Sequence, residues 1–195
     1  MIIKNDLSKA KKIVILLHGR GGDAQDILNI SNFIPNKDVS FIAVTANNNQ
    51  WYPYPFTNSI SSNQPYLSKS LEVIDELINY ASKFVSQDKI YVVGFSQGAC
   101  LALHYIATNN VSIAQVIAFS GGLIGLEEEL KITNKYNNNI FIGCSSNDPF
   151  INIDRVKITV DMFKKNDFNI KTLIYDANSH IISKDELNYL KQLLS

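Results

Sequence analysis

Short apolar runs recur along the chain, and each is too short to form a helix. They are mostly apolar on both faces, which is typical of strands buried inside a parallel sheet. The six predicted strands span Ile13–Leu17, Val39–Val44, Ile90–Val93, Gln115–Phe119, Ile140–Cys144 and Ile170–Tyr175. Helical spacing of apolar residues is found at Ala24–Phe33, Leu67–Val85, Gln97–Thr108, Asp154–Asn166 and Lys184–Leu194. This alternation predicts an α/β fold with a mostly parallel sheet and helices on both faces.

Two longer connections interrupt this alternation within what we expect to be one domain over residues 1–195. Asn47–Pro65 is longer than a usual connection, and an ordered loop of this kind is predicted to form a pocket wall. Its aromatic residues, the candidate substrate-binding residues, are Trp51, Tyr52, Tyr54 and Phe56. The alternative for them is a loop packed on the domain surface. Gly121–Asn139 is predicted to be an acidic turn and a polar loop in solvent.

The charge balance excludes partners that are held by bulk charge. Basic and acidic side chains number 18 each, so neither a nucleic acid nor an anionic membrane would meet an excess of positive charge. Met1–Lys12 lacks the apolar core of a signal peptide, which indicates a soluble, cytoplasmic protein. Cys100 and Cys144 lack the spacing of a disulfide framework or a zinc site, so free thiols are expected, and no metal.

A candidate nucleophile lies between a predicted strand and a predicted helix. Gly94-Phe95-Ser96-Gln97-Gly98 matches G-x-S-x-G, in which a tight turn exposes a strained serine at the end of a strand. The alternative is a glycine-lined turn that only packs the helix on the sheet. Because a serine hydroxyl attacks a carbonyl poorly unaided, a histidine must accept its proton and a carboxylate must orient that histidine.

The partners of Ser96 follow from chain order, in which the acid comes after the serine and the histidine comes last. His180, on the loop after the last predicted strand, is therefore favoured over His104 within a helix and over His18, which is expected to fix a loop. Asp148 follows the strand that ends at Cys144 and is the favoured acid. The rival acids are Asp154, expected to cap the next helix, and Asp176, which precedes His180 on the same loop.

Negative charge that develops on a carbonyl oxygen requires donors that are already in place. In this strand-turn-helix arrangement they are the backbone N–H after the serine, here Gln97, and one from the loop after the first core strand, here Arg20. A nucleotide site is not supported, because the glycine-rich turn after His18 matches neither common phosphate-binding pattern.

Six parts of the chain together carry a family resemblance: His18-Gly-Arg-Gly-Gly, Trp51-Tyr-Pro-Tyr, Gly94-Phe-Ser-Gln-Gly-Ala, Ser120-Gly-Gly and the loops of Asp148 and His180. Over nearly its whole length the chain resembles the phospholipase/carboxylesterase family of small α/β-hydrolases, which includes the acyl-protein thioesterases. The resemblance implies a compact α/β-hydrolase sheet without a large lid, and ester or thioester hydrolysis without a cofactor. It also implies Ser96, Asp148 and His180 as the triad and the Arg20 and Gln97 N–H groups as oxyanion donors.

The sequence therefore predicts a serine carboxylesterase that acts on a small-molecule ester through an acyl-enzyme intermediate. Lysophospholipase or acyl-protein thioesterase activity is the alternative within the same mechanism. A hydrolase-like protein that only binds a small apolar ligand is the alternative outside enzymes. No feature predicts membrane insertion, and a homodimer is compatible with the sequence.

Overall fold

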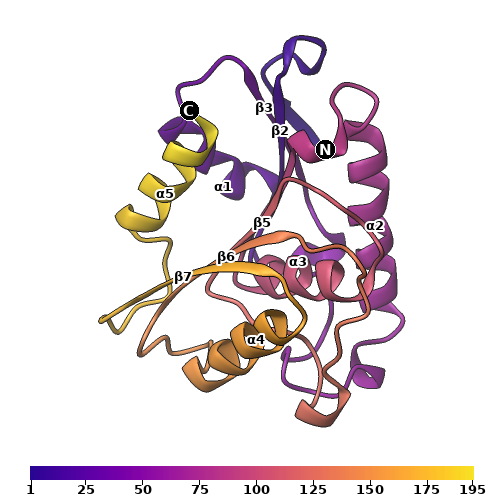
Figure 1. Ribbon diagram of the computed structural model, residues 1–195, viewed down its shortest axis with the longest axis vertical. Helices are drawn as coiled ribbons and strands as arrows, with labels where there is room; N and C mark the ends of the chain where they lie inside the picture. The colour runs from indigo at the N-terminus through magenta and orange to yellow at the C-terminus, as the bar shows by residue number, and fades with distance from the viewer.

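Seven strands form one sheet in the computed structural model, which describes all 195 residues (Figure 1). They are β1 (Ile2–Lys4), β2 (Lys12–Leu17), β3 (Val39–Val44), β4 (Ile90–Phe95), β5 (Gln115–Phe119), β6 (Asn139–Ser145) and β7 (Asn169–Tyr175). Their order is β1-β3-β2-β4-β5-β6-β7, and every pair is parallel except β1 with β3. The mostly parallel sheet is confirmed, and all six predicted strands are present.

The seventh strand, β1, corrects the expected number of strands. It pairs in antiparallel register with the edge strand β3, with Ile2 opposite Ala43. A strand of three residues at a sheet edge has too few positions to show a hydrophobic period, so the pattern of the sequence does not reveal it.

Helices cover both faces of the sheet. One face carries α2 (Tyr66–Ala81), α3 (Gln97–Thr108) and α4 (Ile153–Lys165), and the other carries α1 (Ala24–Leu28) and α5 (Lys184–Leu194). Helix α1 is shorter than the predicted helix, because Asn29–Phe33 continues as a tighter 3₁₀ turn. Ser31 Oγ donates to the carbonyl of Leu28 at 2.6 Å in this turn, a local bond with which serine competes with regular helix.

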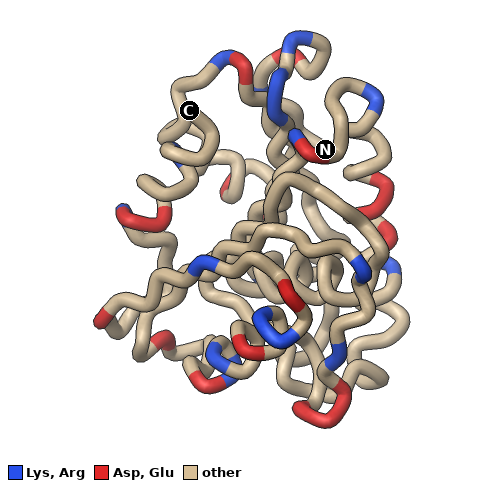
Figure 2. Tube along the Cα trace, viewed as in Figure 1, with Lys and Arg blue, Asp and Glu red and all other residues tan.

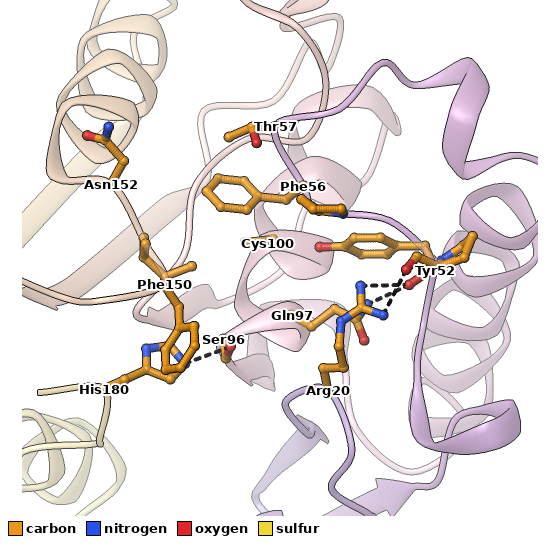
Figure 3. Close-up of a pocket in the computed structure, with 13 residues that line it drawn as sticks. Arg20, Tyr52, Phe56, Thr57, Ser96, Gln97, Cys100, Phe150, Asn152 and His180 are labelled. Atoms are coloured by element: carbon orange, nitrogen blue, oxygen red, sulfur yellow. Dashed lines mark hydrogen bonds between the residues drawn. The ribbon is translucent and has the colours of Figure 1, made fainter.

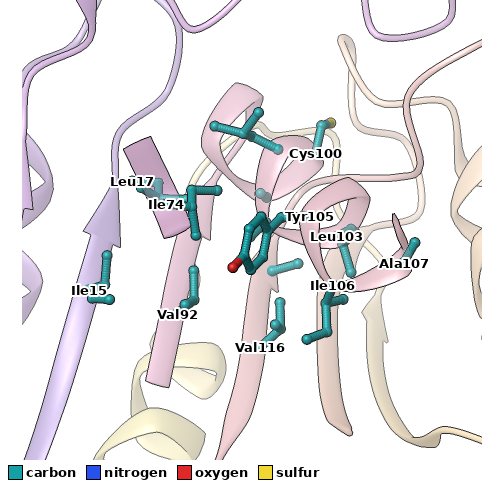
Figure 4. Packing of buried hydrophobic residues seen from close by; sticks show 14 of the residues in the cluster. Ile15, Leu17, Ile74, Val92, Cys100, Leu103, Tyr105, Ile106, Ala107 and Val116 are labelled. Atoms are coloured by element: carbon teal, nitrogen blue, oxygen red, sulfur yellow. The ribbon is translucent and has the colours of Figure 1, made fainter. Parts of the chain in front are cut away.

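Helix α3 is the most deeply buried helix and fixes the position of the residue before it. Eleven of its twelve residues are buried between the sheet and α2. Figure 4 shows the side chains of Tyr105 and Ile106 close to those of Val92 and Val116 on the strands. The Tyr105 hydroxyl, in the C-terminal half of α3, also donates to Asp75 of α2 at 2.9 Å, so α3 is held by both layers.

The strand register brings the carboxyl ends of the central strands to one edge. Leu17 of β2 lies opposite Gly94 of β4, and Gly94 lies opposite Ala118 of β5. The segments that follow β2, β4 and β5 therefore start side by side, at the edge where open α/β sheets bind ligands.

Charged residues of both signs are interspersed along the chain (Figure 2). The acidic turn expected after β5 is present as a short 3₁₀ turn, Glu127–Glu129. No helix combines the length and the apolar character that crossing a membrane requires.

Candidate active site

Ser96 lies on a sharp turn between β4 and α3. Its backbone has φ 53° and ψ −116°, a conformation that L-residues rarely adopt, and its N–H donates to the Phe119 carbonyl at 2.9 Å. A Cβ on Gly98 would collide with the carbonyl oxygen of Leu17, and one on Gly94 would collide with that of Gly98. The two glycines of the G-x-S-x-G pattern are thus required by backbone packing around the serine.

The structure brings Ser96, His180 and Asp148 together in one hydrogen-bonded chain (Figure 3 shows Ser96 and His180). Ser96 Oγ lies 2.8 Å from His180 Nε2. On the other side of the ring, His180 Nδ1 lies 2.9 Å from Asp148 Oδ1 and 2.7 Å from Oδ2. This arrangement allows a proton to pass from the hydroxyl to the imidazole while the carboxylate holds the opposite nitrogen.

Asp148 is held as a carboxylate. Its side chain is fully buried, and burial alone would raise its pKa. Hydrogen bonds from His180 and from the N–H groups of Phe150 and Ile151, at 2.9 and 3.0 Å, outweigh burial and keep the pKa of Asp148 below its ordinary value of 3.8. The acid is therefore charged whenever the histidine is available to act as a base.

The rival residues make other contacts. Asp176 is exposed and accepts a weak bond from Ser146 Oγ at 3.3 Å. Asp154 lies in the first turn of α4, which is capped by the Asn152 side chain, so the cap expected at Asp154 is displaced by two residues. His104 is buried within α3, where burial lowers its pKa to about 4.

His18 fixes the loop after β2, as its position predicts. Its Nε2 accepts the N–H of Ala46 at 3.0 Å, so the ring proton is on Nδ1, which donates to the Gly19 carbonyl at 2.6 Å. The His18 carbonyl in turn accepts the indole N–H of Trp51 at 2.9 Å. A Cβ on Gly19 would lie only 3.3 Å from that of Ser96, which shows how closely this loop approaches the serine.

The two expected oxyanion donors are free to bind. Neither the backbone N–H of Arg20 nor that of Gln97 has an acceptor in the protein. Gln97 is the first residue of α3, where N–H groups lack partners within the helix and the helix dipole favours negative charge.

The side chains of Arg20 and Gln97 bind the loop Asn47–Pro65, which carries the aromatic residues. The sequence did not predict these contacts. Gln97 accepts the Trp51 N–H at 2.9 Å and donates to the Tyr52 carbonyl at 2.7 Å. The Arg20 guanidinium donates four bonds of 2.7–3.1 Å, to the Gln50 side chain and to the carbonyls of Tyr52, Pro53 and Tyr54. Backbone carbonyls exist at every residue, so no sequence signal marks them as partners.

A cavity of about 780 Å³ opens beside Ser96. It is lined by Arg20, Tyr52, Pro53, Pro55, Phe56, Thr57, Ser96, Gln97, Cys100, Phe150, Ile151, Asn152 and His180. Of the four aromatic residues expected to line it, Tyr52 and Phe56 do so. Trp51 is instead buried against His18, and Tyr54 is half exposed and faces a separate, more polar cavity.

The loop that carries His180 is fixed by contacts that the sequence did not reveal. Ser145 Oγ donates to the Ser179 carbonyl at 2.8 Å, and the buried Glu186 accepts the Ser183 N–H at 2.6 Å. Phe150 packs edge-on against the His180 ring, with 5.0 Å between the ring centroids. The loop is therefore fixed by hydrogen bonds before and after His180, and the imidazole ring itself is packed against Phe150.

Comparison with known proteins gives a consistent result over the whole chain. A family model described as Phospholipase/Carboxylesterase matches residues 1–195. Acyl-protein thioesterase 1 of Candida albicans is 32% identical, covering 92% of this chain and 89% of the relative, and that of Debaryomyces hansenii is 30% identical, covering 91% and 88%. The crystal structure of a phospholipase/carboxylesterase from Dyadobacter fermentans superimposes with a TM-score of 0.91 at 33% identity, covering 99% and 94% of the two chains.

Proposed function

The chain belongs to the phospholipase/carboxylesterase family of α/β-hydrolases, and we propose that it hydrolyses carboxylic esters with Ser96 as the nucleophile. As a member of this family the protein is an ester-cleaving hydrolase. The observation that carries the assignment of Ser96 is the chain of short bonds from its hydroxyl through His180 to the buried Asp148.

Acylation begins when Ser96 Oγ attacks the ester carbonyl carbon while His180 Nε2 takes the hydroxyl proton. The carbonyl oxygen becomes negatively charged and accepts the N–H groups of Arg20 and Gln97. Asp148 stabilises the resulting imidazolium through Nδ1. When the tetrahedral intermediate collapses, His180 gives its proton to the leaving oxygen, and the alcohol departs from an acyl-Ser96 ester.

Deacylation repeats these steps with water as the nucleophile. His180 takes a proton from water, the hydroxide attacks the acyl-enzyme, and the proton returns to Ser96 Oγ as the acid is released. One water is consumed, one acid and one alcohol are formed, and no redox partner is required.

Tyr52 and Phe56 support an apolar acyl pocket, since both line the cavity beside the serine. Thioesters form a second candidate substrate class. The support is that two relatives, each matched over most of its length, are acyl-protein thioesterases. A thiolate leaves more readily than an alkoxide, and the same donors and the same histidine serve both reactions. Cytoplasmic location and a homodimer remain part of the proposal, testable by fractionation and light scattering.

The test is turnover of nitrophenyl esters of increasing acyl length, together with the matching thioesters. Ser96→Ala should lose essentially all turnover, whereas Ser68→Ala, an exposed serine on α2, should retain it. The optimum chain length then reports the depth of the pocket. Equal loss or equal retention in the two variants would contradict Ser96 as the nucleophile and favour a protein that only binds its ligand.

A further inference from the structure

The cavity beside Ser96 carries positive charge and no negative charge. Arg20 is the only side chain among its thirteen lining residues that is permanently charged, and none is Asp or Glu. The Arg20 guanidinium forms no salt bridge, because all four of its acceptors are neutral carbonyl or amide oxygens. Its charge is therefore held in place by the loop but is not neutralised.

A second guanidinium lies beside Phe56, one of the residues that line the cavity. Arg155 of α4 is only 7% exposed and lies 6.0 Å from the ring centroid of Phe56, which lines the cavity. It donates only to the carbonyls of Leu123 and Gly125, at 3.1 and 2.8 Å, and also forms no salt bridge. A buried cation without a carboxylate partner is uncommon, since its desolvation is normally offset by an opposite charge.

The carboxylates on the neighbouring segments do not line the cavity and form no salt bridge with Arg20. Asp148 binds His180 Nδ1 and is not among the residues that line the cavity, and Asp154 at the start of α4 is paired with Lys157 at 3.0 Å. Asp26 borders a smaller cavity on the other side of Arg20, where it accepts the Asp23 N–H in the cap of α1. The one permanent charge among the side chains that line the cavity is therefore the positive charge of Arg20.

The orientation of the substrate on Ser96 decides which part of it lies near the Arg20 guanidinium. The leaving oxygen must face His180, from which it takes a proton. The carbonyl oxygen faces the Arg20 and Gln97 N–H groups, so the acyl chain extends into the cavity beside Ser96. The Arg20 guanidinium borders this cavity on the side of Ser96 away from His180 (Figure 3).

From these observations we infer that the enzyme prefers esters whose acyl chain carries a carboxylate, with Arg20 as the residue that determines this specificity. The inference rests on the proposed function and names its substrate class. The carboxylate is drawn to the positive charge of a guanidinium that the loop already holds in place. At a separation of about 6 Å near a protein surface, such a screened attraction amounts to a preference of about three- to tenfold.

Two substrates with the same leaving group and the same number of acyl carbons test the inference: nitrophenyl hydrogen adipate and nitrophenyl hexanoate. The measured quantity is the ratio of their kcat/KM values, because changes in loop position affect both substrates and cancel in the ratio. The wild-type enzyme should favour the adipate by about three- to tenfold, and added salt should reduce this ratio.

Variants separate the charge from other effects. Arg20→Gln retains the backbone N–H and should bring the ratio close to one, mainly through KM for the adipate. Arg20→Lys retains the charge and should keep most of the ratio. Lys191→Gln removes the same charge from an exposed position on α5 and should leave the ratio at the wild-type value.

A wild-type ratio of one or less, or an unchanged ratio in Arg20→Gln, overturns the inference while Ser96-dependent turnover of the hexanoate leaves the proposed function intact. Absence of Ser96-dependent turnover of either ester overturns both.

Discussion

Replacing Asp148 with Asn changes one atom that faces His180 and leaves the remaining geometry nearly unaltered. Asp148 Oδ1 accepts the N–H groups of Phe150 and Ile151, so the amide oxygen of Asn keeps this position. The amide nitrogen must then occupy the site of Oδ2, 2.7 Å from His180 Nδ1. Because an amide NH₂ only donates, it forces His180 Nδ1 to become an acceptor.

The ring proton of His180 then lies on Nε2, the atom that must take the proton of Ser96 across 2.8 Å. The base is blocked and the imidazolium loses its counter-charge. For loss of the acid from such a triad we expect kcat to fall by about 10³- to 10⁴-fold, equivalent to about 4–5.5 kcal/mol of activation free energy. The fold should lose only about 1 kcal/mol, because the bonds to the two backbone N–H groups remain.

The assay compares kcat for a nitrophenyl ester with the midpoint of thermal unfolding in the same preparations. Asp176→Asn is the matched control, since Asp176 is an exposed acid on the His180 loop that does not contact the ring, and it should behave like the wild type. An Asp148→Asn variant with more than about a tenth of the wild-type kcat would refute the tautomer argument. So would an equal loss in both variants.

Three further perturbations test the packing around the site. Gly98→Ala should destabilise the fold by about 1–3 kcal/mol and lower activity, because the new Cβ meets the Leu17 carbonyl oxygen; an unchanged unfolding midpoint would contradict this. Burial raises the pKa of Glu186 above 4.5, so the folded state binds that proton more tightly than the unfolded chain does. The difference in free energy of unfolding between the wild type and Glu186→Gln, measured by urea titration, should therefore shift against the wild type as pH rises from acidic to neutral. A difference that does not change with pH would contradict the raised pKa of Glu186. Burial raises the pKa of both Cys100 and Cys144 to about 12, so neither thiol should react with a disulfide reagent at neutral pH until the protein is unfolded, and rapid native labelling would count against their placement.

The arrangement of the candidate site follows from the sequence wherever it depends on chain order and local turns. A serine between Gly94 and Gly98 after a buried run predicts the turn, and chain order selects His180 and Asp148 for the positions that the structure brings together. Parallel strands end at one edge, so residues far apart in the sequence meet there without any further signal.

The sequence could not predict contacts whose partners are backbone atoms of distant segments. Trp51 is buried because its indole meets the His18 carbonyl, and this removes it from the pocket wall expected of an aromatic loop. The bonds of Arg20 to the loop carbonyls have the same origin. The edge strand β1 and the burial of Glu186 against Gly143 likewise depend on tertiary placement and not on any local period.

The activation of Ser96 is tested most directly by covalent labelling with a fluorophosphonate, followed by mass spectrometry of the digested protein. We predict one phosphonylated serine, Ser96, with labelling slowed by a competing ester and abolished in Asp148→Asn on the same time scale. Labelling of another serine, or none in the wild type while the fold is intact, would contradict the assignment of Ser96 as a nucleophile activated by His180 and Asp148.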